Sequence, residues 1–148
     1  MIENKLVEKL KEKKYKISFA ESCTGGLLAS TIINVSGSSS VIEESYITYS
    51  ENAKMKLLDV KKETLDKYTV YSKEVALEMA KGLKNKTNSN VCVSVTGIAE
   101  SDNECRCHYC IIIENEIIVK EYTTIGSRNE VRLNYTKHIL EEIYSFLA

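Results

Sequence analysis

A serine stands where a predicted strand meets a predicted helix, in the segment Ser22-Cys23-Thr24-Gly25-Gly26. A side chain at such a turn is exposed beyond the carboxyl end of the strand, beside the backbone N–H groups with which a helix begins. Glycines there let the main chain approach a ligand closely. The turn therefore suits a phosphate or a developing oxyanion, although a helix cap without chemistry uses the same residue types.

A serine hydroxyl becomes a good nucleophile only when a neighbouring base takes its proton. The chain has two histidines. His138 falls in the middle of a predicted helix on its surface side, and His108 lies among cysteines, so we expect neither to be the base. The alternative is a lysine whose amine is kept neutral by desolvation or by nearby positive charge. The chain has too many lysines for spacing alone to choose one.

Four residues of types that bind metals gather in one short segment, Cys105, Cys107, His108 and Cys110. Their spacing is not a common zinc pattern, and no second ligand pair accompanies them. In a strand, alternate members would also face opposite sides. We therefore expect small buried thiols, no metal and no cofactor, and we expect Cys23 to be a packing thiol as well.

Composition limits the classes of protein that remain. The chain has 148 residues, 43% of them hydrophobic and 28% charged, with a formal net charge of -1. This balance is typical of a globular domain, and the lack of a basic stripe argues against nucleic-acid binding. Residues 1–6 carry charges where a signal peptide needs an apolar core. No apolar run is long enough for a membrane span. We therefore expect a cytoplasmic protein with free thiols and no membrane partner.

Hydrophobic periodicity predicts helices and strands that alternate first and end in a hairpin and a helix. The predicted helices are residues 2–10, 27–33, 51–58, 75–83 and 131–143, and the predicted strands are 15–20, 41–49, 91–96, 109–113 and 117–125. Ser72 is a good N-cap for the helix predicted over residues 75–83. The order favours one domain over residues 1–148, an α/β protein built as a three-layer α/β/α sandwich with a mixed, mostly parallel sheet.

Several segments match the sequence motifs of one known family and occur in the same order. They are residues 20–26 (AESCTGG), 35–39 (VSGSS), 48–54 (TYSENAK), 57–60 (LLDV), 72–82 (SKEVALEMAKG), 96–99 (TGIA) and 126–132 (GSRNEVR). The chain thereby resembles the family built on the C-terminal domain of the competence/damage-inducible protein CinA, over nearly its whole length. Full-length relatives carry a second, N-terminal domain, for which we expect no room in this chain.

The resemblance implies an activity and a set of site residues. Active members hydrolyse the carboxamide of nicotinamide mononucleotide to nicotinic acid mononucleotide and ammonia, a step of NAD salvage in the pyridine nucleotide cycle, without a metal or cofactor. It implies Ser22 as the nucleophile, Lys54 as its base and Tyr49 as a residue that relays or positions the proton. The implied substrate-binding residues are Thr24, Gly25, Gly26, Ser38, Thr96, Gly97 and Arg128. Among these, Arg128 is suited to meet the phosphate in a two-pronged contact.

The chain departs from the family directly after residues 96–99. There the family has a glycine-rich GPGG loop, whereas this chain carries acids, including Glu100 and Asp102, and a bulky Tyr109 where the family has a glycine before the next strand. We expect residues 100–105 to be mobile or differently folded, and Glu100 to repel a phosphate if it faces the pocket. Three alternatives stay open: a working amidohydrolase, the same chemistry on another substrate, and a non-catalytic protein that binds a nucleotide or protein partner. The sequence also leaves a homo-oligomer open.

Overall fold

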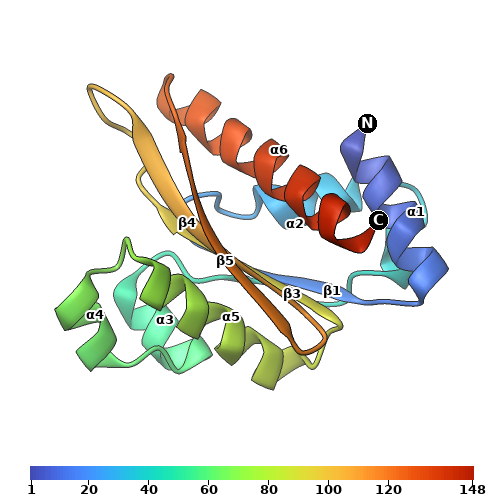
Figure 1. Ribbon diagram of the computed structural model, residues 1–148, viewed down its shortest axis with the longest axis horizontal. Coiled ribbons are helices and arrows are strands. Elements are labelled where there is room, and N and C mark those ends of the chain that lie inside the picture. Colours follow the sequence, from blue (N-terminus) through green and yellow to red (C-terminus); the bar gives the residue numbers. More distant parts are fainter.

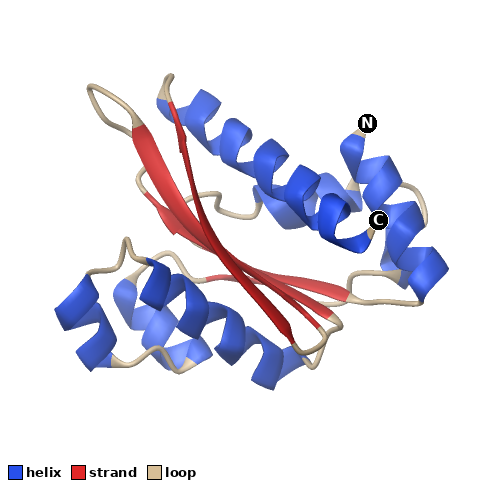
Figure 2. Ribbon diagram, viewed as in Figure 1, coloured by secondary structure: helices blue, strands red, loops and turns tan.

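A five-stranded sheet lies between two layers of helices in the computed structural model, which describes residues 1–148 (Figures 1 and 2). The elements are α1 (Ile2–Lys13), β1 (Ile17–Glu21), α2 (Leu27–Ile33), the 3-10 turn η1 (Ser38–Ser40), β2 (Tyr46–Ile47), α3 (Glu51–Leu58), α4 (Lys62–Tyr68), α5 (Lys73–Thr87), β3 (Val91–Gly97), β4 (Cys105–Ile113), β5 (Glu116–Thr124) and α6 (Arg128–Leu147). Helices α1, α2 and α6 cover one face of the sheet, and α3, α4 and α5 lie on the other (Figure 1).

The strand order is β2-β1-β3-β4-β5. Strand β1 pairs in parallel with both β2 and β3, while β3–β4 and β4–β5 are antiparallel pairs. Only β4 therefore runs against the other strands. The expected three-layer α/β/α sandwich with a mixed sheet is confirmed.

Alternation along β3 divides the interior into two cores. Val91, Val93 and Val95 pack with α1, α2 and α6, whereas Cys92 packs with α5 on the opposite face. Ser94 on that second face donates its hydroxyl hydrogen bond to the carbonyl of Ala76 in α5. Burying each valine contributes roughly 1.5–3 kcal/mol, so a one-residue slip of β3 would exchange the two faces at a large cost. This register fixes where β3 ends, at the site.

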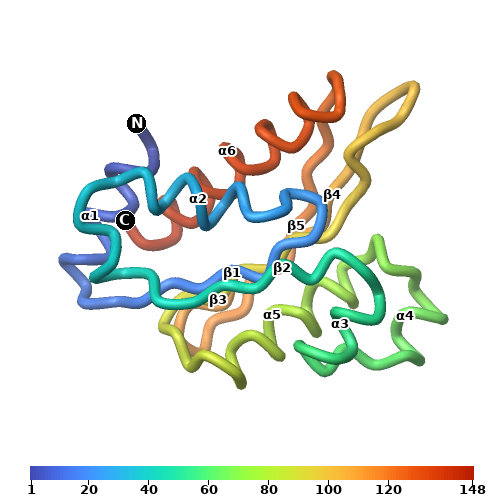
Figure 3. Tube along the Cα trace, turned by 180° about the vertical axis from the view of Figure 1, so that it is seen from behind, coloured from blue at the N-terminus to red at the C-terminus, as the bar shows by residue number.

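The parallel strands bring their carboxyl ends to one edge of the sheet. From β1 the chain crosses through α2 to the outer strand β2, then returns through α3, α4 and α5 to β3 on the other side of β1 (Figure 3). Such a change in the direction of strand addition opens a crevice at the carboxyl ends of the two neighbouring strands. Segments that follow β1, β2 and β3 thus meet although they lie far apart in sequence.

Two elements differ from those predicted from the sequence. The strand expected over residues 41–49 is reduced to Tyr46–Ile47, because the side chain of Ser45 accepts a hydrogen bond from Phe19 N–H at 3.0 Å, in the place of a backbone partner. Helix α4 was not predicted, because only Thr64 and Leu65 of its residues are buried and leave no helical periodicity to read. None of the helices combines the length and apolar character that a bilayer crossing requires.

A buried carboxylate explains how α2 starts. Glu21, the last residue of β1, is 1% exposed. Its Oε1 accepts hydrogen bonds from the Leu28 N–H at 2.9 Å and the Thr24 hydroxyl at 2.6 Å, and its Oε2 accepts one from the Ala29 N–H at 3.0 Å. The carboxylate thereby supplies acceptors for first-turn N–H groups of the helix and complements the helix dipole.

Replacing Glu21 tests this cap. Glu21→Gln removes the charge and turns an NH2 group toward donors, so we expect a loss of roughly 2–4 kcal/mol in the free energy of unfolding, measured by urea denaturation. Glu104→Gln, in an exposed loop, makes the same change of charge and should alter stability by less than about 0.5 kcal/mol. Equal stability of the two variants would contradict the capping role.

Candidate active site

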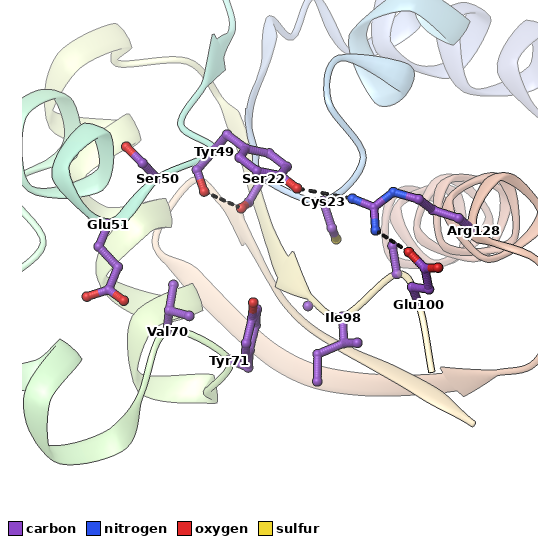
Figure 4. A pocket seen from close by; sticks show the side chains of 12 residues that line it. Ser22, Cys23, Tyr49, Ser50, Glu51, Val70, Tyr71, Ile98, Glu100 and Arg128 are labelled. Atoms are coloured by element: carbon purple, nitrogen blue, oxygen red, sulfur yellow. Dashed lines mark hydrogen bonds and ion pairs between the residues drawn. The ribbon is translucent and has the colours of Figure 1, made fainter. Parts of the chain in front are cut away.

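A cavity of about 460 Å³ opens at the carboxyl ends of β1 and β3 (Figure 4). Its wall is formed by residues from the ends of β1 and β3, from the start of α3, from the segment before α5 and from the start of α6. They are Ser22, Cys23, Tyr49, Ser50, Glu51, Val70, Tyr71, Gly97, Ile98, Ala99, Glu100 and Arg128. The cavity therefore lies at the crevice that the topology creates.

Ser22 follows β1 directly and is 7% exposed. After it the chain turns through Gly25 and Gly26, whose φ angles of +57° and +100° lie in the left-handed region that glycine tolerates. At the start of α2, the N–H groups of Leu28 and Ala29 are bonded to the carboxylate of Glu21 and are not free to receive a ligand. Thr24, Gly25 and Gly26 thus build the turn, and the structure does not bring them into the cavity wall.

An arginine from the last helix holds this turn in place. Arg132 of α6 donates from Nε to the carbonyl of Cys23 at 2.8 Å and from Nη2 to the carbonyl of Thr24 at 3.0 Å. Both carbonyls follow Ser22 directly, so the guanidinium fixes the backbone that carries its hydroxyl. Sequence reasoning missed Arg132, although it lies in the same 126–132 segment that drew attention to Arg128.

The amine of Lys54 lies beneath Ser22. Lys54, on α3, is fully buried. Its Nζ donates to Ser22 Oγ at 2.9 Å, to the Thr48 carbonyl at 2.6 Å and to the Tyr49 carbonyl at 3.2 Å. The structure therefore brings together Ser22 and Lys54, separated by 32 positions in sequence. Three acceptors match the three hydrogens of an ammonium group.

Burial changes the proton affinity of Lys54. Desolvation lowers the pKa of its amine from 10.5 to about 8, although the nearby Glu51 carboxylate acts in the opposite direction. Once neutral, the amine keeps two hydrogens, which the carbonyls of Thr48 and Tyr49 can accept. Its lone pair is then free to accept the hydroxyl proton of Ser22. The same contacts thus serve both protonation states.

Cys23, next to Ser22 in the chain, is a second nucleophilic side chain of the cavity wall. Burial raises the pKa of its thiol to about 12, so it stays protonated in the neutral range. A thiol reacts through its thiolate. The neighbouring serine, in contact with a base of lowered pKa, is therefore the better nucleophile of the two.

Tyr49 and Arg128 contact each other across the cavity mouth (Figure 4). Nη2 of Arg128 donates to the Tyr49 hydroxyl at 3.1 Å, and Nη1 forms an ion pair with Glu100 Oε1 at 3.2 Å. The phenol of Tyr49 is thus bonded to Arg128, whereas only the Tyr49 carbonyl reaches the serine and the lysine. Tyr49 therefore supports the Ser22–Lys54 pair through its backbone carbonyl. Its type of side chain could not predict this role.

The remaining candidates occupy different places. Gly97 lines the cavity and is needed as glycine, because an added Cβ would lie 2.6 Å from the Cα of Cys107 on β4. Thr96 is buried outside the wall, where its hydroxyl donates to the carbonyl of the wall residue Val70 at 2.9 Å. Ser38 lies in η1, away from the cavity.

The wall also includes residues that the sequence did not indicate. Tyr71 and Ile98 are partly exposed large side chains that give the cavity an apolar side opposite Tyr49 (Figure 4). Glu51 adds a carboxylate at the start of α3. These residues stand in short irregular segments or at element ends, where periodicity carries no information.

The cysteine-rich segment forms the start of β4. Cys105, Cys107 and Cys110 are buried free thiols, and Cys107 and Cys110 face opposite cores, as alternation in a strand requires. No group of three His, Cys, Asp or Glu side chains lies close enough to hold a metal ion. Because Cys105 already belongs to β4, the irregular part of the departing loop is residues 98–104.

Comparisons with known proteins all point to one family. The family model described as "CinA C-terminal domain" matches residues 1–147. A "CinA-like protein" from Petrotoga mobilis is 39% identical over 141 residues, which are 91% of this chain and 35% of that protein. The chain thus spans about a third of the length of the curated relatives that it matches.

Solved structures share the fold over nearly the whole chain. The competence/damage inducible protein CihA from Agrobacterium tumefaciens superposes with a TM-score of 0.90 at 30% identity, covering 97% of this chain and 92% of that chain. A CinA superfamily protein from Klebsiella pneumoniae has a TM-score of 0.93 at 19% identity, covering 99% and 95%. The second likeness is one of fold alone.

The protonation of Lys54 is directly measurable. In protein with 13C-labelled lysine, the Lys54 side chain should titrate with a midpoint near pH 8, because burial disfavours its charged form. Lys54→Met identifies its resonance. Glu51→Gln should lower the midpoint further, since the carboxylate favours the ammonium. A midpoint near 10.5, the ordinary lysine value, would contradict the lowered pKa.

Proposed function

Since the chain belongs to the CinA C-terminal domain family, we propose that it is an amidohydrolase that converts nicotinamide mononucleotide and water to nicotinic acid mononucleotide and ammonia. The observation that carries this proposal is the 2.9 Å contact between Ser22 Oγ and the buried Nζ of Lys54 at the edge of the cavity. A hydroxyl paired with a desolvated amine is equipped for acyl transfer without a metal or cofactor.

In the first half of the reaction, neutral Lys54 takes the Ser22 proton while Oγ attacks the amide carbon. The carbonyl oxygen then becomes an oxyanion. The backbone N–H of Cys23 is available to it, because it donates no hydrogen bond to another residue. When the carbon–nitrogen bond breaks, Lys54 returns the proton to the leaving ammonia, and an ester joins Ser22 to the acyl group.

In the second half, water enters the place that ammonia has left. Lys54, neutral again, takes a proton from the water as it attacks the ester. Collapse of the second tetrahedral species breaks the bond to Oγ, and Lys54 gives the proton back to Ser22. One water is consumed and one ammonia is released, and the enzyme returns to its starting state.

The cavity suits a pyridine ring next to this serine. Tyr49 and Tyr71 offer aromatic faces to a positively charged pyridinium, which aromatic rings attract. Arg128 lies at the same mouth and is the only cationic residue of the wall. A ring held between the tyrosines would therefore extend its sugar toward Arg128.

Two substitutions test the serine–lysine pair in an ammonia-release assay with nicotinamide mononucleotide. Ser22→Ala and Lys54→Met should each lower kcat by at least about 1000-fold, because nucleophile and base act as one unit. Matched controls are Ser39→Ala and Lys56→Met, which change exposed residues of the same types and should retain activity. Full activity of either site variant would refute the mechanism. An inert but folded wild-type protein would favour the non-catalytic binding role.

The activity should also depend on pH in a defined direction. The base is the neutral amine, and the pKa of Lys54 is lowered to about 8. Below that pH the rate should therefore rise about tenfold per unit, and above it the rate should level off. Initial rates between pH 6 and 10 check this, and a flat profile across the neutral range would exclude Lys54 as the base.

A further inference from the structure

The only cation in the cavity wall is already paired. Arg128 contacts the Glu100 carboxylate through Nη1 and the Tyr49 hydroxyl through Nη2. The wall contains two carboxylates, Glu51 and Glu100, against this one guanidinium. Its formal charge is therefore -1, because Lys54 lies beneath the wall and is not part of it.

The surface just outside the pair offers no second cationic side chain. A shallow hollow beyond it is lined by Glu100, Asp102 and Arg128, together with Ile98, Ser101, Gly126 and Ser127. The start of α6 in this hollow carries a capping box. The Ser127 N–H donates to Glu130 Oε1 at 2.8 Å, and the Glu130 N–H donates to Ser127 Oγ at 3.4 Å. An anionic group leaving the cavity would meet two carboxylates there, and the N–H groups of Ser127 and Glu130 are already bonded.

Resting on the proposed function, we infer that Glu100 is a specificity-determining residue that masks Arg128. Its effect is to favour a pyridinium carboxamide with an uncharged ribosyl group over the same compound with a 5′-phosphate. A phosphate that approaches the guanidinium must compete with the Glu100 carboxylate, which stays nearby on the loop and repels it. An unphosphorylated ribose leaves the ion pair intact, and its hydroxyls can donate to the Glu100 carboxylate. The negative wall still attracts the positive ring.

The size of this effect follows from the exposure of the pair. Arg128 and Glu100 keep side-chain exposures of 50% and 73%, so their attraction is weak and the carboxylate can be displaced. Competition with Glu100 and repulsion by it together should lower selectivity for the phosphorylated ligand on the order of tenfold. Salt should reduce the difference, since exposed charges are screened.

A pair of substrates that differ only in the phosphate tests the inference. We expect Glu100→Gln to raise kcat/KM for nicotinamide mononucleotide, relative to nicotinamide riboside, on the order of tenfold. Glu104→Gln changes the net charge of the same loop equally but involves an exposed residue outside the cavity, so it should leave the ratio unchanged. An unchanged ratio in Glu100→Gln, or an equal change in both variants, overturns the role of Glu100.

Equilibrium binding separates this inference from the catalytic proposal. With Ser22→Ala as the background, calorimetry can compare both ligands with and without Glu100→Gln, and no turnover is required. A selective gain in affinity for the phosphorylated ligand supports the inference even if the wild-type chain releases no ammonia. If the wild type turns over substrate but Ser22→Ala shows the same ligand selectivity with and without Glu100→Gln, the inference is overturned and the amidohydrolase proposal stands. If neither ligand binds, the assignment of pyridinium carboxamides as the substrate class is overturned.

Discussion

The hydrogen bond between the buried Lys54 amine and Ser22 is the interaction on which the site depends. Removing an ammonium group from water is costly, and here the cost is offset by the carbonyls of Thr48 and Tyr49 and by the serine hydroxyl. The balance leaves the pKa of the amine near 8, close enough to neutrality for the group to exchange protons. A surface lysine could not do this, and a lysine buried without acceptors would destabilise the fold.

The rest of the architecture keeps Ser22 above this amine. Glu21 joins the end of β1 to the start of α2, and Arg132 reaches across from α6 to the carbonyls that follow the serine. The turn is therefore held from both of the elements that flank it and from the opposite end of the chain. By contrast, the loop of residues 98–104 contributes only Ile98, Ala99 and Glu100 to the wall, and beyond Ile98 its one polar side-chain contact with another element is the Glu100–Arg128 ion pair. In that loop Glu100 alters the charge of the cavity without touching the serine–lysine pair.

Much of the fold could be predicted from the sequence, because the short apolar run of β3 and the helical spacing in α5 and α6 are local patterns produced by burial. The pairing of Ser22 with Lys54 came only from the family resemblance, since many lysines have similar local surroundings. The bonds of Glu21, Arg132 and the Tyr49 hydroxyl could not be predicted. Arg132 and Cys23 lie 109 positions apart, and no local pattern encodes such a contact. The same is true of β2, where one serine side chain shortens the strand.

The most direct test of the central claim is to identify the covalent intermediate. Protein mixed with nicotinamide mononucleotide would be quenched in acid during the first turnover, digested and examined by mass spectrometry. The serine–lysine mechanism predicts an ester on Ser22, carrying the nicotinic acid mononucleotide acyl group. Ammonia release accompanied by an adduct on Cys23, or by no adduct at any residue under the same quench, would contradict it.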